Sequence, residues 1–190
     1  MTTTSKIAIC SNALLELGDN PISSFALSEG KRARLCGNLW DQVRDELLRK
    51  HAWPCCRKVE NLAPEATAYS PDWGYSFLLP GDWLRTLQIG ARGERMEYEH
   101  IGRRLCANTN ALPLIYVWRN EDPAQWDSTL VDLATKAMVA RMAYAITQSA
   151  SLAELKAAEF KQALKEAKAV AGQDNAPEDW GDSPFVEARY

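Results

Sequence analysis

Three residues that could carry chemistry lie close together at the end of a charged segment: His51 and the adjacent cysteines Cys55 and Cys56, in "HAWPCC". A thiolate beside an imidazole can act as a nucleophile, and both side chains bind zinc. A structural zinc site, however, needs about four ligands, usually in pairs with C-x2-C spacing. Adjacent cysteines lack this spacing, and the sequence holds one other histidine, His100. We therefore interpret His51 as a residue at a helix C-terminus and the cysteines as packing groups, with a small thiol or metal enzyme as the alternative.

The rest of the sequence holds no motif that is typical of catalysis or cofactor binding. Neither a P-loop, nor a G-x-G-x-x-G turn after a strand, nor a G-x-S-x-G or H-E-x-x-H motif is present. The five cysteines are an odd number scattered over the chain, which favours free thiols in a reducing compartment over a disulfide framework. The sequence therefore predicts a protein that is not an enzyme and that uses no metal or cofactor.

Length and charge narrow the class of protein further. The chain has 190 residues, which suits one domain or a core domain with an insertion. Its net charge of −3 at pH 7 provides no overall basic field for holding nucleic acid by the phosphates. No apolar run approaches the roughly 20 residues that a membrane-spanning helix needs. We expect a protein without a membrane partner.

Two helices are predicted in the N-terminal part of the chain. Residues 4–17 form the first, with Thr4 or Ser5 as the N-cap and Gly18 just past its end. The second covers residues 28–51 and is stopped by Pro54. Its apolar residues recur at helical spacing and form one predicted stripe: Leu35, Leu39, Trp40, Val43 and Leu47.

The charges of the second helix allow two interpretations. Acids precede bases at helical spacing, which predicts the surface pairs Asp41–Arg44, Asp45–Arg49 and Glu46–Lys50. A basic cluster at the helix start, Lys31, Arg32 and Arg34, follows a short helix and superficially suggests a helix-turn-helix DNA reader. About ten residues separate the two helices, however, whereas such motifs have turns of about 3–4 residues. A small DNA-binding regulator therefore stays an alternative only.

Residues 55–119 have the character of short strands. The runs "YSFLLP", "WLRTLQIGA" and "LPLIYVW" are rich in strand-forming residues, and the turn signals "PGD", "RGE" and "NTNA" separate such runs. "ARGERM", residues 91–96, is predicted to be a hairpin connection that is exposed and reaches across a subunit boundary. We expect one small antiparallel sheet inserted between helices.

Helix returns in the last third of the chain. A helix capped by Asp127 or Ser128 and running to Ile146 is apolar almost all round, which predicts burial on most sides. A fourth helix over residues 152–171 has one apolar face, including Leu155 and Phe160. The predicted class is α+β: a four-helix bundle of residues 1–54 and 120–172, a β-rich insertion of residues 55–119, and an extended C-terminal arm of residues 173–190.

The C-terminal arm combines acids with aromatic side chains. Its 18 residues hold two prolines and five acids against one arginine. Prolines interrupt a helix and the acids oppose collapse onto the protein, yet the large apolar side chains still require burial. We therefore predict a docking arm that becomes ordered on a partner, with these residues as anchors: Trp180, Pro184, Phe185 and Tyr190.

Three blocks of the sequence resemble one family. "NALLELGDNPISS", "ARLCGNLWDQVRDELLRKHAWPCC" and "YSFLLPGDWLR" are similar to the head-to-tail adaptor proteins of tailed bacteriophages, the group that includes tail tubular protein A of short-tailed phages. The block "DQVRDELLR", residues 41–49, is the most specific. Trp40 stands where tyrosine is more usual, and "HAWPCC" where "HPWNFA" is. The similarity extends over the whole order of elements.

This resemblance implies a structural protein of the virion. Such adaptors assemble in the host cytoplasm as dodecameric rings beneath the portal protein, at the head–tail interface. They bind a downstream tail or nozzle protein and extend the channel through which genomic DNA passes without sequence-specific binding. The charged faces of the second helix, with Asp41, Arg44, Asp45 and Arg49, would then meet neighbouring subunits, and the arm would dock on the portal.

Overall fold

A computed structural model describes residues 4–26, 30–91 and 96–173 of the chain. These residues form four α-helices: α1 (Lys6–Glu16), α2 (Lys31–Arg49), α3 (Ser128–Thr147) and α4 (Ala150–Gln173). They also form six strands: β1 (Arg57–Leu62), β2 (Tyr75–Leu78), β3 (Trp83–Ile89), β4 (Tyr98–Ile101), β5 (Arg104–Ala107) and β6 (Leu112–Trp118). The predicted α+β class is confirmed.

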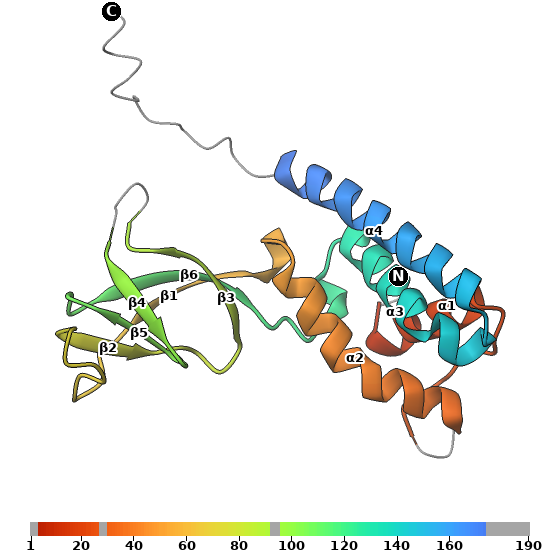
Figure 1. Cartoon of the computed structure of the whole chain (residues 1–190), viewed down its shortest axis with the longest axis horizontal. Coiled ribbons are helices and arrows are strands. Elements are labelled where there is room, and N and C mark those ends of the chain that lie inside the picture. The colour runs from red at the N-terminus through yellow and green to blue at the C-terminus, as the bar shows by residue number, and fades with distance from the viewer. Residues whose placement is uncertain (1–3, 27–29, 92–95, 174–190) are drawn as a thin grey trace, which may run out of the picture.

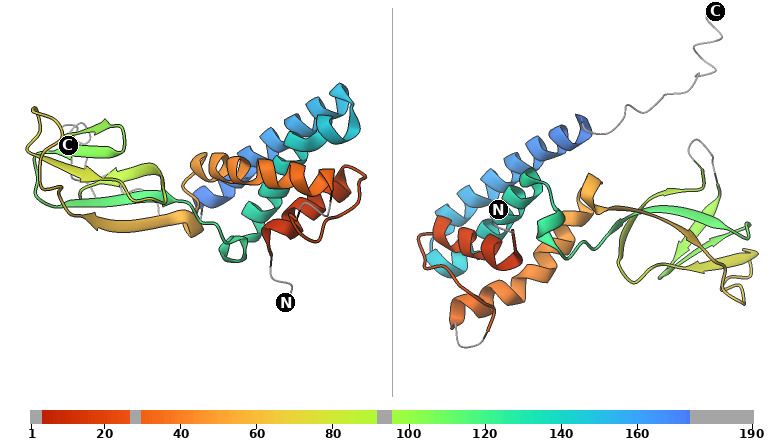
Figure 2. Two further views of the ribbon diagram at one scale, coloured as in Figure 1. Left: turned by 90° about the horizontal axis from the view of Figure 1, so that it is seen from below. Right: turned by 180° about the vertical axis from the view of Figure 1, so that it is seen from behind.

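Helices and strands occupy opposite ends of an elongated molecule (Figure 1). The chain leaves the helices after α2 and returns to them after β6. One hydrophobic core gathers residues from all four helices, and a second lies between the two sheets around Phe77, Leu105 and Tyr116. Two further views show the same separation, with the strands beyond the C-terminal end of α2 (Figure 2). The strands therefore form a unit with its own core, called here the β region.

Local sequence determines where the helices begin and end. Ser5 caps α1, because its Oγ accepts a hydrogen bond from the Ala8 N–H at 3.2 Å. Gly18 follows α1 with φ of 77°, a conformation that favours glycine over L side chains. Asp127 caps α3, with its Oδ1 accepting from the Leu130 N–H at 2.8 Å. Both predicted caps are confirmed.

The central helix of the bundle is α3, which contacts α1, α2 and α4 and buries apolar residues along its length. The predicted stripe on α2 is only partly right. Trp40, Val43 and Leu47 are buried, but Leu35 and Leu39 lie half-buried at the edge of the core. A row of residues four apart precesses about 40° per step around a helix, so its first members leave the buried face.

Helix α4 covers one side of the bundle and differs from the prediction in two ways. It extends to Gln173, so this residue closes the helix instead of opening the arm. Leu155, expected on the apolar face, is 53% exposed, and the buried residues of α4 are Ala167 and Ala171. The predicted anchors of the arm, at positions 180, 184, 185 and 190, lie outside the described residues. No helix in the described part of the chain is long and apolar enough to cross a membrane.

The β region contains two three-stranded antiparallel sheets, where one was predicted. One sheet has the strand order β1-β6-β3 and the other β2-β5-β4. The segment "ARGERM" therefore joins strands of different sheets and is not a hairpin connection, because β3 pairs with β6 and β4 with β5. Its residues 92–95 lie outside the described residues. The hairpin is β4–β5, which turns at Gly102 with φ of 61°.

Candidate functional site

The two cysteines of the predicted thiol site lie at the edge of the helical core. The Sγ atoms of Cys55 and Cys56 are 3.7 Å apart, and Cys55 Sγ is 3.9 Å from Asp127 Oδ2. Cys56 is fully buried. The hydrogen bond between the thiols, and then burial, raises the pKa of Cys56, whereas the same hydrogen bond lowers the pKa of Cys55. Cys55 therefore lies beside the N-cap of α3, and Cys56 is part of the helical core.

His51 has different neighbours from the two cysteines. Its ring packs edge-on against Trp53, with 4.9 Å between the centroids. Burial, aided by the positive charges of Lys168 and Arg85, lowers the pKa of His51 and favours the neutral imidazole. In the described part of the chain, no group of three or more His, Cys, Asp and Glu side chains is placed to hold a metal ion. The other histidine, His100, lies in the β region.

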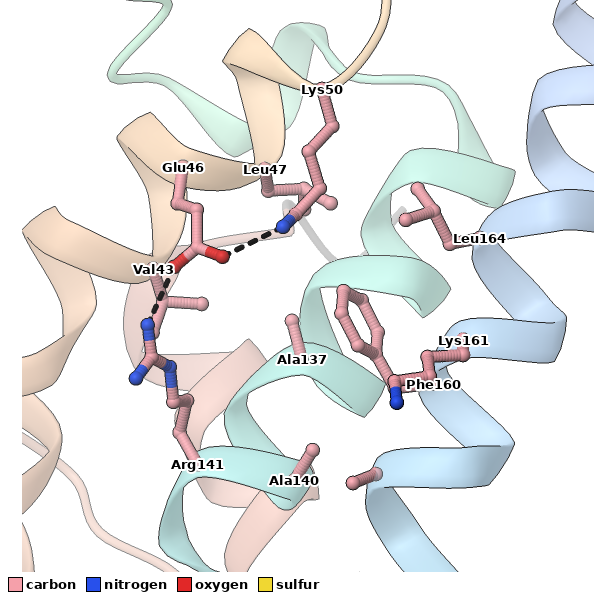
Figure 3. A pocket seen from close by; sticks show the side chains of 11 residues that line it. Val43, Glu46, Leu47, Lys50, Ala137, Ala140, Arg141, Phe160, Lys161 and Leu164 are labelled. Carbon is pink, nitrogen blue, oxygen red and sulfur yellow. Dashed lines mark hydrogen bonds and ion pairs between the residues drawn. The ribbon is translucent and has the colours of Figure 1, made fainter.

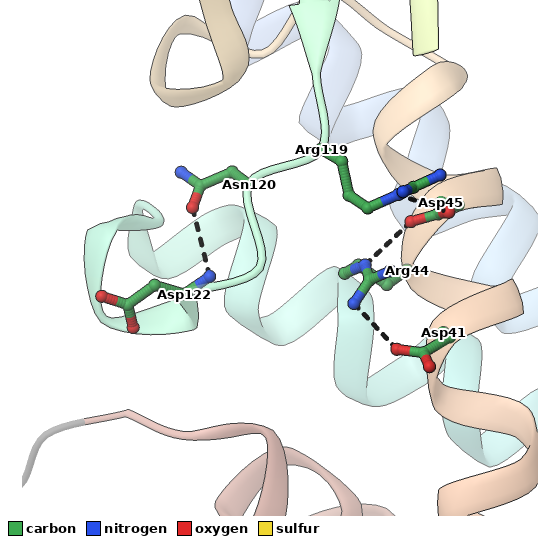
Figure 4. A network of polar contacts seen from close by, with 6 residues as sticks. All are labelled: Asp41, Arg44, Asp45, Arg119, Asn120 and Asp122. Carbon is green, nitrogen blue, oxygen red and sulfur yellow. Dashed lines mark hydrogen bonds and ion pairs between the residues drawn. The ribbon is translucent and has the colours of Figure 1, made fainter. Parts of the chain in front are cut away.

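A buried arginine marks the junction between the helices and the β region (Figure 4). The Arg44 side chain is only 6% exposed, although it carries a full charge. Its Nη1 donates to Asp41 Oδ1 and its Nε to Asp45 Oδ1, each at 2.8 Å. The second carboxylate oxygen of Asp45 accepts from Arg119 Nε at 2.9 Å, just after β6. Asp45 therefore joins α2 to the end of the β region.

Further hydrogen bonds tie the same junction together. The Arg119 N–H donates to the Asp82 carbonyl at 2.7 Å. Arg49, in the last turn of α2, donates to the carbonyl of Leu84 and lies 5.9 Å from the centroid of the Trp83 ring. The blocks "DQVRDELLR" and "LPGDWLR", which carry the family resemblance in the sequence, thus contact each other across the junction.

Asn120 connects the two crossings of the chain between the bundle and the β region. It is 1% exposed, and its Nδ2 donates to the Cys55 carbonyl at 3.1 Å. Cys55 lies just before β1 and Asn120 just after β6, so this bond holds the outgoing and returning segments side by side.

The four residues predicted to lie between subunits therefore have partners within the chain. Two predicted pairs, Asp41–Arg44 and Glu46–Lys50, are confirmed. The predicted pair Asp45–Arg49 is wrong: Asp45 binds Arg44 and Arg119, because the returning chain brings Arg119 to α2. Asp41, with a side chain that is 76% exposed, keeps the most surface for a neighbour. A contact of these residues with another subunit stays a prediction.

A polar cluster that the sequence did not reveal lies inside the β region, around the buried Tyr116. Its hydroxyl lies 3.0 Å from Asp82 Oδ1 and 3.1 Å from Glu60 Oε2, while Lys58 Nζ is 2.8 Å from Asp82 Oδ2. Burial and the neighbouring carboxylates raise the pKa of Tyr116, so the hydroxyl stays protonated. The single hydroxyl proton can be donated to one carboxylate at a time, and Lys58 neutralises Asp82; the cluster brings together β1, β6 and the "LPGDWLR" block.

The bundle also contains a groove where α2, α3 and α4 meet (Figure 3). Its volume is about 320 Å³. Apolar side chains from the three helices line it, among them Val43, Ala137, Phe160 and Leu164. A second groove of about 430 Å³ lies between the end of α4 and the segments around Trp53 and Trp126. Neither was predicted, because each arises from elements far apart in the sequence.

The chain matches no family model and no curated protein sequence. We therefore infer its function from the fold, from the contacts at the junction, and from the three sequence blocks that resemble an adaptor family.

The junction gives a first prediction. Replacing Arg44 with Ala should lower the free energy of unfolding by about 1.5–3 kcal/mol, because two charged hydrogen bonds and a buried side chain are lost. Urea denaturation followed by circular dichroism measures this. The matched control is Lys136→Ala, which removes the exposed ion pair with Asp132 on α3 and should cost less than about 0.5 kcal/mol. Equal losses in the two variants would show that Arg44 has no special role.

His51 gives a second prediction. Because folding lowers the pKa of His51, the unfolded chain binds more protons near the ordinary value of 6.5. The stability that the neutral imidazole provides is present above that pH and is lost as the pH falls toward the pKa of the folded state. The thermal midpoint should therefore fall between about pH 7.5 and pH 5.5. His51→Gln should reduce this fall; identical pH profiles for wild type and His51→Gln would contradict the prediction.

Proposed function

We propose that the chain is a structural head-to-tail adaptor of a tailed bacteriophage, which forms a dodecameric ring beneath the portal and extends the DNA channel. The observation that carries this proposal is the order of elements: two helices, a β-rich insertion, two longer helices and a polar C-terminal segment. The same order accompanies the three sequence blocks that resemble this family. Its place in the virion would be the head–tail interface, after assembly in the host cytoplasm.

Exposed apolar residues in the β region support contacts with other proteins. Tyr75 and Tyr98 both pair in register with Ala107, so the three side chains lie in one row across the sheet. The two tyrosines are 39% and 47% exposed, and Val59 on the edge strand β1 is 69% exposed. Ala107 is buried in the core of the β region, so the row lies at the edge of that core, where both tyrosines stay partly exposed. Tyrosine is enriched at protein interfaces. We assign this end of the molecule to a neighbouring subunit or to the downstream tail or nozzle protein.

The electrostatics suit a ring around moving DNA. Several basic side chains on the helices are paired with acids of the same chain, as in Arg44 with Asp45 and Arg141 with Glu46. Paired bases offer DNA fewer phosphate contacts than an open basic stripe, so the duplex could slide without being held. A ring of identical subunits further requires two different faces on each subunit, and this asymmetric molecule offers distinct helical and strand ends.

The interaction with the portal gives a third prediction. Deleting residues 174–190 should preserve the fold, because the described cores lie outside this segment, but should abolish stable attachment to rings of the portal protein. Weak contacts repeated around a ring add through effective concentration, so their loss should be complete in co-sedimentation. The control is the full chain carrying Lys31→Glu, which should co-sediment normally. A truncated chain that attaches at wild-type stoichiometry would contradict the docking role of the arm.

A further inference from the structure

The groove between α2, α3 and α4 has an apolar floor and a mainly basic rim (Figure 3). The one acid in its lining, Glu46, is bound by Lys50 at 2.7 Å and by Arg141 at 2.5 Å. Lys161 lies on the opposite wall, beside Phe160, and makes no ion pair with any other described residue. Three bases against one acid leave the rim positively charged. The groove therefore fits a ligand that combines acidic groups with an apolar or aromatic side chain.

The chain itself contains a segment of this chemistry. Residues 174–190 hold five acids, one arginine and three aromatic residues. Removing them from the chain's 25 acidic and 22 basic residues leaves 20 acidic and 21 basic residues, so this segment accounts for the net negative charge. We propose that residues 174–190 bind in the groove of their own chain when the subunit is free, with Trp180 against the apolar floor and the neighbouring acids beside Lys161, Lys50 and Arg141.

The distance along α4 permits this placement. The part of α4 between Phe160 and Gln173 covers 13 residues and is therefore about 20 Å long at 1.5 Å per residue. The seven residues from Gln173 to Trp180 span up to about 23 Å when extended. Trp180 can therefore reach the groove after a reversal of the chain. A tether this short also gives the segment a high effective concentration at its own groove.

The second groove is a poorer site for the same segment, although it lies nearer to the end of α4. Its lining includes Asp127 and contains no Lys, Arg or His. An acidic segment would gain no charge pairing there and would be repelled by the carboxylate. The negative charge of the segment therefore favours binding in the groove of α2, α3 and α4.

This binding adds a regulatory step that rests on the proposed adaptor function. The arm proposed to dock on the portal would be held on its own subunit until the portal competes for it. Free subunits would then keep their aromatic anchors covered and would not associate through them. The contact inside the chain can be tested without any portal, so its failure leaves the adaptor proposal to its own test.

Hydrogen exchange of the full-length protein, read by mass spectrometry, tests the placement. Wild-type protein should show slowed exchange in residues 174–190. Lys161→Glu reverses a charge on the exposed rim and should speed exchange of that segment by about twofold to fivefold. Lys31→Glu makes the same charge change at the distant start of α2 and should leave the segment unchanged. Trp180→Ser should speed exchange at residues 157–164 of α4, which line the groove.

Three outcomes would overturn the proposal. The first is unprotected exchange of residues 174–190 in wild type. The second is an equal effect of Lys161→Glu and Lys31→Glu on that segment. The third is protection that appears only at high protein concentration, since this would place the segment in the groove of another copy.

Discussion

The Asp45 carboxylate links the β region to the helices, beside Leu84 and Val117, which pack from the strands into the helical core. One of its oxygens binds the buried Arg44 on α2 and the other binds Arg119 where the chain returns from β6. A charged guanidinium at 6% exposure is costly unless its hydrogen bonds are made, so Arg44 requires both of its acid partners in place. Asn120 adds the bond to the Cys55 carbonyl that joins the two crossings of the chain. Together these contacts restrict how far the β region can swing on α2.

A fixed junction suits the proposed role better than a hinge would. In a ring, each subunit repeats the same contacts, and an error in the angle between its two ends would be repeated around the ring. The two resembling blocks, "DQVRDELLR" and "LPGDWLR", supply opposite sides of this junction through Arg49 and the carbonyl of Leu84. Tyr116 of β6 then contacts Glu60 of β1 and Asp82 of the "LPGDWLR" block, which places both strands relative to the junction. The charged residues of α2 therefore support the shape of the subunit, whatever they contribute between subunits.

Local features were predictable from the sequence, and features made by distant segments were not. Ser5 and Asp127 cap helices through hydrogen bonds three residues away, and Asp41 meets Arg44 one turn along α2. By contrast, Arg119 reaches Asp45 from 74 residues away. Strand pairing is equally non-local, which is why two sheets form where one was expected and why "ARGERM" does not close a hairpin. The grooves depend on how several elements pack, so the spacing of residues in the sequence does not predict them. The four charges on α2 were recognised as a group, but their role at the junction became visible only with the returning chain.

We propose that this protein builds a ring on a portal. The most direct measurement is electron microscopy of the purified protein mixed with rings of a candidate portal protein. The adaptor proposal predicts a dodecameric ring that is coaxial with the portal and lengthens its channel, with identical elongated subunits whose two ends contact different partners. A protein that stays a monomer or a small symmetric oligomer in the presence of portal rings, with no added density beneath them, would contradict it.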